Sequence, residues 1–258
     1  MRNALVHFWQ TLIAAALVLA VPAQAAVTYT VAHEGTFASD GLTVTSFSCT
    51  SGRTLLAYAQ AMSTVFDAQI GTALSATGWT AITGSDSSAS PGWGYASRAF
   101  TKTCAGTTDS FSGSATWNAG ATEHAKVTVL ELQGQDATTP FRTVSKDVVD
   151  QAETVSTGLT LSQAPLNTSL TLGFITISSN GGTQTLGAGP SGGFTERHES
   201  GVADWTFFQW QDRSASTSTT VDWATSTGLA GGVTLAIEIA ASTASPTGLS
   251  KILQQLEH

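Results

Sequence analysis

The chain is poor in charge and in cysteine. Only 11% of its 258 residues are charged, with 10 Lys or Arg against 18 Asp or Glu, and the formal net charge is −8. A surface that binds nucleic acid needs clustered Lys and Arg, and the sequence has no such cluster, so we expect no nucleic acid among its partners. The cysteines, Cys49 and Cys104, are too far apart for a CxxC or zinc motif. We expect no metal and no other cofactor.

An apolar segment stands at the N-terminus. Arg2 precedes an apolar core at Leu12–Val21, and Ala23-Gln24-Ala25 has the small residues of a cleavage site. Residues 1–25 are therefore predicted to be a secretory signal peptide cut before Ala26. The alternative is a retained hydrophobic anchor, which is the one case in which we expect contact with a membrane. Both readings place the protein outside the cytoplasm, in a secreted, cell-surface or virion-surface location.

An oxidising compartment lets the two cysteines pair. We expect a Cys49–Cys104 disulfide, which would add up to about 4 kcal/mol of stability in the chain-entropy model. The alternative is two unpaired thiols in separate strands.

Few lysines and many short runs of Val, Ile, Thr and aromatic residues predict an all-β protein. The chain also resembles itself. The segment from Gly41 matches that from Gly158, and VTVLELQ matches TLAIEIA, which begins at Thr234. We therefore expect an internal duplication of residues 41–133 and 158–239. The strands are predicted at 42–47, 54–61, 79–83, 93–101, 109–116 and 126–133, and again at 159–163, 169–177, 194–199, 205–213, 217–221 and 233–239.

These strands predict one jelly-roll-like β-sandwich domain of two sheets over residues 26–241. Two small sandwiches are the alternative. Residues 242–258 are predicted to be a linker and a short C-terminal helix, in which Ile252, Leu253 and Leu256 share one side.

No group of residues predicts a catalytic site. In Glu196-Arg197-His198-Glu199, strand alternation places Glu196 and His198 on one face and the other two residues on the opposite face. The pairs His33-Glu34 and Glu123-His124 lack the spacing of a metal motif.

Glu131 and Glu238 occupy the same position of the duplicated strand. The apolar neighbours of each glutamate take the opposite face, which predicts outward-facing glutamates rather than the paired carboxylates of a glycosidase.

The aromatic segment TFFQWQ and the Trp205 before it give the one candidate ligand surface. Trp205 and Phe207 lie on one face of the predicted strand and Trp210 on the other. Only one face can belong to the core of a two-sheet sandwich. We expect the other face to expose rings that bind a sugar or a protein, with Trp205, Phe207 and Trp210 as the candidate residues.

The order of GWT, YASRAF, VTVLELQGQDATTPF, GLTLSQAPLNTSLTLGFIT, GGFTERHES and WATSTGLAGGVTLAIEIA resembles a loosely defined set of β-sandwich proteins. These are found in bacteriophage structural gene clusters and among bacterial surface or secreted proteins. The resemblance spans about residues 30–241 and rests on turn and packing signatures. It implies a jelly-roll-like sandwich displayed on a particle or cell surface, with no catalytic residues carried over. The N-terminal leader departs from the phage members.

Together these features predict a non-enzymatic structural or surface-displayed protein that contacts other protein subunits, its own copies included. A carbohydrate-binding module or adhesin that contacts surface glycans is the alternative. A polysaccharide-cleaving enzyme comes third, because it needs paired carboxylates.

Overall fold

The computed structural model describes residues 26–66, 70–89, 93–149, 158–179, 192–202, 206–223 and 229–242. In these ranges every regular element is a β-strand, which confirms the all-β prediction, and no helix has the length and hydrophobicity that a membrane crossing needs. The strands are β1 (Thr28–Glu34), β2 (Thr43–Ser48), β3 (Thr54–Phe66), β4 (Ile70–Ala76), β5 (Thr80–Ala81), β6 (Ser87–Ala89), β7 (Trp93–Thr103), β8 (Thr108–Trp117), β9 (Thr122–Gln133), β10 (Phe141–Val149), β11 (Gly158–Thr160), β12 (Leu170–Ser179), β13 (Thr195–Val202), β14 (Thr206–Ser214), β15 (Thr220–Asp222) and β16 (Leu229–Ile239).

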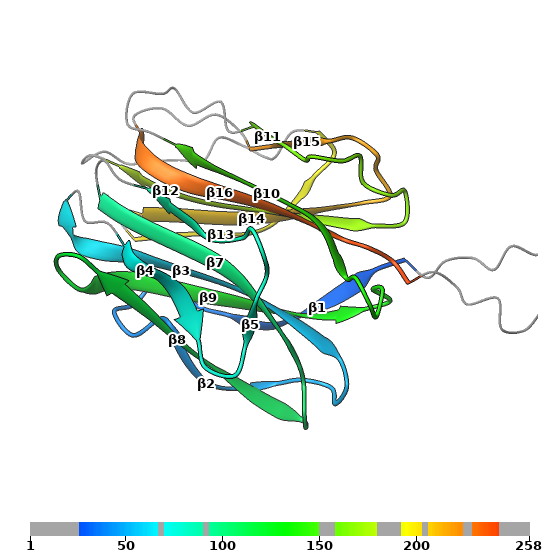
Figure 1. Ribbon diagram of the computed structural model, residues 1–258, viewed down its shortest axis with the longest axis horizontal. Helices are drawn as coiled ribbons and strands as arrows, with labels where there is room; N and C mark the ends of the chain where they lie inside the picture. Colours follow the sequence, from blue (N-terminus) through cyan, green and yellow to red (C-terminus); the bar gives the residue numbers. More distant parts are fainter. Residues whose placement is uncertain are drawn as a thin grey trace, which may run out of the picture.

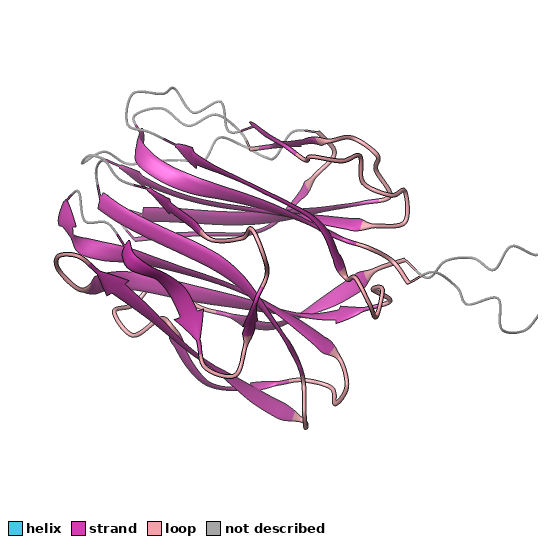
Figure 2. Cartoon of the chain, viewed as in Figure 1, coloured by secondary structure: helices cyan, strands magenta, loops and turns pink. Residues whose placement is uncertain are grey.

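The strands form antiparallel sheets stacked in four layers (Figures 1 and 2). Two large sheets face each other in the middle. The first has the order β1-β9-β3-β7-β5, with β6 also on β7, and the second has the order β10-β16-β12-β14-β13. The small sheet β2-β8-β4 covers the outer face of the first large sheet, and β11-β15 covers the second (Figure 1).

The two halves of the chain have the same pairing pattern. The order β1-β9-β3-β7 in the first half corresponds to β10-β16-β12-β14 in the second, and β2-β8 corresponds to β11-β15. Glu131 of β9 lies between Thr30 and Leu55, and Glu238 of β16 lies between Thr143 and Thr171. These two strands, which are similar in sequence, therefore occupy equivalent positions in their sheets.

Each half encloses its own core, and a third core lies between the halves. Phe111 and Val127 belong to the core of the first half, and Val221 and Ile175 to that of the second. In the central core Tyr58 stacks on Phe174, with ring centroids 4.4 Å apart and an interplanar angle of 14°. The arrangement differs from the predicted two-sheet sandwich because each large sheet is buried on both faces, so its inner strands are apolar on both sides.

The predicted disulfide is present. Cys49 and Cys104 are bonded, their Cα atoms are 6.3 Å apart, and the bond joins the β2–β3 loop to the end of β7. The second half keeps the same loop contacts without cysteine. Arg53 O accepts from Cys104 N in the first half, and Ser169 O accepts from Ala215 N in the second.

Some predicted elements fall outside the described residues, and some observed strands were not predicted. The leader, residues 1–25, and residues 243–258 with the predicted helix are outside the described residues. The strands β1, β4, β6 and β10 were not predicted. Of these, β1 and β10 lie at the edges of the large sheets, and β10 carries Lys146 and Asp147, which is usual for edge strands and weakens their apolar pattern.

Candidate functional site

Of the three residues of the predicted aromatic surface, Trp210 is buried. The ring of Trp210 is only 1% exposed and belongs to the central core. Phe207 is half-buried against the core of the second half, and Trp205 is outside the described residues. Trp210 therefore offers no ring face at the surface, and a ligand role stays a prediction for Phe207 and Trp205 alone.

The error has a physical cause. The prediction assumed that a strand of a two-sheet sandwich has one solvent-facing side. The strand β14 lies inside a four-layer stack. The first half covers one face of this strand, with Phe208 and Trp210, and the β11-β15 sheet lies over the other face, where Gln209 and Gln211 are also buried.

Polar side chains from both halves meet at one edge of the central core. We call Glu34, Lys126, Thr128, His198, Ser200 and Trp210 the seam cluster. The Glu34 carboxylate lies at its centre: Oε1 is 2.8 Å from Lys126 Nζ and accepts from Thr128 Oγ1 at 2.8 Å. Oε2 accepts from Trp210 Nε1 at 2.9 Å. A carboxylate of β1 thus binds donors of both halves.

Lys126 is fully buried, which is rare for lysine and requires compensation. Besides Glu34, its ammonium group donates to Ser200 Oγ of β13 at 2.8 Å and lies 4.3 Å from the ring centroid of Phe208. Burial lowers the pKa of Lys126, and Glu34 opposes this effect. The lysine of β9 therefore ties the first half to β13 and β14.

His198 reaches the cluster because β13 is irregular. Glu196 pairs with Gln211 and His198 pairs with Trp210, so Arg197 is an extra residue in the strand. Arg197 Nε binds Asp212 Oδ1 at 2.5 Å, and Asp212 also accepts from Tyr29 of β1. Arg197 and His198 both point to the first half, so the predicted alternation of these two residues is wrong.

The imidazole of His198 lies beside the Lys126–Glu34 ion pair but forms no hydrogen bond with it. Nε2 is 3.7 Å from Glu34 Oε1, too far for a hydrogen bond, and this buried atom has no other hydrogen-bond partner. Burial lowers the pKa of His198, and the Lys126 ammonium lowers it further. Burial also lowers the pKa of the neighbouring His33. The cluster therefore favours a neutral imidazole of His198 next to the ammonium group of Lys126.

The candidate glycosidase carboxylates do not meet. Glu131 and Glu238 lie in different halves, and each points away from the central core, as predicted. Each accepts a backbone N–H from the matching loop of its half: Thr50 N donates to Glu131 at 2.8 Å and Leu166 N to Glu238 at 3.0 Å.

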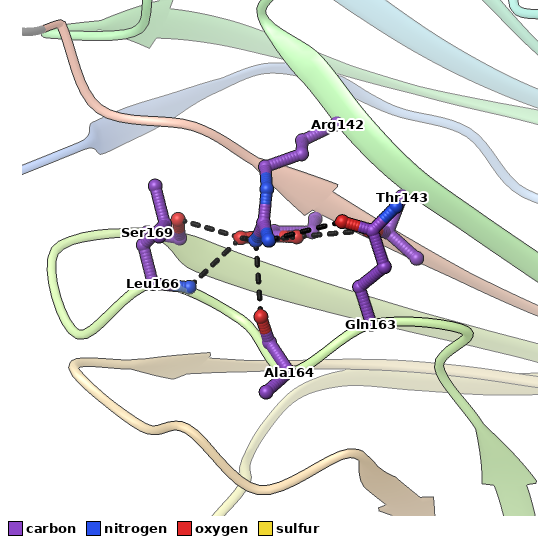
Figure 3. A network of polar contacts seen from close by, with 7 residues as sticks. Arg142, Thr143, Gln163, Ala164, Leu166 and Ser169 are labelled. Atoms are coloured by element: carbon purple, nitrogen blue, oxygen red, sulfur yellow. Dashed lines mark hydrogen bonds and ion pairs between the residues drawn. The ribbon is translucent and has the colours of Figure 1, made fainter.

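Glu238 is not solvent-facing, in contrast to the prediction. Its side chain is fully buried, because Arg142 and the loop before β12 cover it (Figure 3). Arg142 Nη1 binds its two oxygens at 2.6 and 2.8 Å, and Thr143 and Ser169 donate their hydroxyls. A carboxylate with this many donors holds a loop in place and has no free oxygen for a substrate proton.

Metal-ligand atoms come together at one place within the described ranges, namely Cys49, Cys104 and Asp109. The two sulfurs form the disulfide, and Asp109 Oδ1 is 2.6 Å from Lys102 Nζ, so this group is already occupied. Glu123 and His124 contact each other at 4.0 Å as an isolated pair.

Sequence reasoning noted His33-Glu34 and His198 but did not bring them together, and it missed Lys126. One signal was available. Lys126 stands directly before the apolar run VTVL, where a lysine is unexpected unless its charge is paired.

Comparisons with protein-family models, with curated proteins and with solved structures find no match. The resemblance to phage and bacterial surface sandwiches thus stays a prediction.

Proposed function

We propose that this chain is a non-enzymatic, exported protein that is displayed on a cell or particle surface and contacts other protein subunits there. The ends of the described chain carry the proposal. Ser242 N donates to Gly134 O at 2.8 Å, and a Cβ on Gly134 would lie 2.7 Å from Ala26 O. The body therefore begins and ends at one pole (Figure 1). A leader or tail attached there leaves both outer sheets and the opposite pole free.

The disulfide supports export, because such bonds persist in oxidising compartments. The duplicated pairing pattern supports an origin of the body in two copies of one jelly-roll-like unit.

The edges of the large sheets suit contacts with other subunits. Val31 of β1 and Val148 of β10 are 48% and 37% exposed, and the outer backbone groups of an edge strand can pair with another chain. The proposal assigns no catalytic role to Glu131 or Glu238, because both carboxylates hold loops.

The test is to recover the native protein separately from sedimented particles or envelopes and from the soluble fraction, and to determine its N-terminus by mass spectrometry. We expect the protein in a surface or particle fraction with Cys49 and Cys104 bonded. A chain that begins at Ala26 indicates export by cleavage, and one that keeps residues 1–25 indicates an anchor. Recovery as a strict monomer found only in the soluble fraction would overturn the proposal.

A further inference from the structure

We propose that the seam cluster is an acid-sensitive latch that holds strand β13 against the first half of the molecule. The cluster is the place where β13 touches that half through charge. Lys126 of β9 donates to Ser200 of β13, and His198 of β13 lies beside Glu34 of β1.

The strand β13 is the element that such a latch can release. It is the edge strand of its sheet and pairs only with β14 in the described part of the chain. Its ladder is interrupted at Arg197, and its exposed and half-buried residues alternate. Edge strands with few buried contacts open at lower free energy than the core of a protein.

One carboxylate serves every cation of the cluster. The charged groups that act on His198 are Glu34 of β1, Lys126 of β9 and Glu196 of β13, while β14 contributes the rings of Phe208 and Trp210. Glu34 already binds Lys126. A proton on His198 places a second cation against the same carboxylate and next to the buried ammonium.

The sign of the effect follows from burial. Burial and Lys126 lower the pKa of His198 in the closed seam, and opening β13 to water returns it toward its ordinary value of 6.5. Below pH 6.5 the open form therefore takes up a proton that the closed form resists. A difference of one proton raises the opening equilibrium by at most about tenfold per pH unit. Well above pH 6.5 both forms are neutral at His198, and the equilibrium no longer depends on pH through this group.

The opposite edge of the central core provides an internal reference. There Lys146 of β10 lies 3.4 Å from Asp86, and both side chains are largely exposed. This pair contains no histidine, the residue type that ordinarily changes its charge between pH 5 and 8. Acid in this range should therefore act at β13 and not at β10.

The experiment is hydrogen exchange of the full chain at pH 7.5 and pH 5.5, corrected for the intrinsic exchange rate. We expect opening of β13 to rise between about 3-fold and 10-fold at pH 5.5, and protection of β10 to stay constant. In His198→Gln, which keeps a polar side chain but does not titrate, the rise should vanish. In the matched variant His33→Gln it should persist.

Protection of β13 that does not change with pH would overturn the proposal, and so would an acid response that survives in His198→Gln or disappears in His33→Gln. A measurement on the unmodified protein covers the case in which a variant fails to fold. The ring protons of His198 followed by NMR should titrate below pH 6.5, and a midpoint at or above 6.5 contradicts the latch.

Discussion

At the scale of single residues, the two repeated glutamates, Glu131 and Glu238, are expected to contribute differently to the stability of the fold. Glu238 is buried and binds Arg142, two hydroxyls and a backbone N–H, whereas half-buried Glu131 accepts from Thr50 N. We expect Glu238→Gln to lower the free energy of unfolding by about 2–4 kcal/mol, because an amide cannot replace a buried charge paired with arginine. The matched variant Glu131→Gln should cost about 1 kcal/mol or less. Urea unfolding of both variants measures this, and equal losses would contradict it.

The sequence predicted the side of the sheet for these residues but not their surroundings. Alternation along VTVLELQ and TLAIEIA correctly directed both glutamates away from the central core. The burial of Glu238 depends on Arg142, which is distant in sequence, and on a loop whose course no local pattern specifies. The predicted orientation of His198 relative to Arg197 is wrong for a related reason. Arg197 is an extra residue in β13 and interrupts the alternation of side chains directly before His198.

At the scale of elements, the β2–β3 loop and its counterpart before β12 are held by different means. The first is joined to the end of β7 by the disulfide, and the second is held by the Arg142–Glu238 network (Figure 3). This difference separates their responses to reduction.

We expect the double variant Cys49→Ala/Cys104→Ala, or reduction of the native protein, to lower the free energy of unfolding by up to about 4 kcal/mol, the chain-entropy value for a loop of this length. Hydrogen exchange should become faster at residues 49–53 and 104–107, where Cys49 N donates a hydrogen bond to Thr107 O. It should not change at the matching residues 165–169. Equal quickening of both loops would show that the disulfide stabilises more than its own half.

At the scale of the whole molecule, strand content was predictable and layering was not. Runs such as TLLAYAQAM in β3 and LTLGFITI in β12 are apolar on both faces, which is the mark of a sheet covered on both sides. A two-sheet sandwich covers each sheet once. Two similar halves with such strands therefore require a third core between them, and that core supplies the seam where the charged groups of β1, β9 and β13 meet.

The shared core predicts that the two halves unfold together. Phe174 is fully buried and stacks on Tyr58 of the other half, so Phe174→Ala should lower the free energy of unfolding by about 3–5 kcal/mol. Phe111→Ala removes a ring of similar size from the outer core of the first half. If the central core couples the halves, each variant should shift the denaturant midpoint equally for amides of β8 in the first half and β12 in the second. A Phe111→Ala shift confined to β8 would mean that the halves are independent units, and the central core would then be an interface between them.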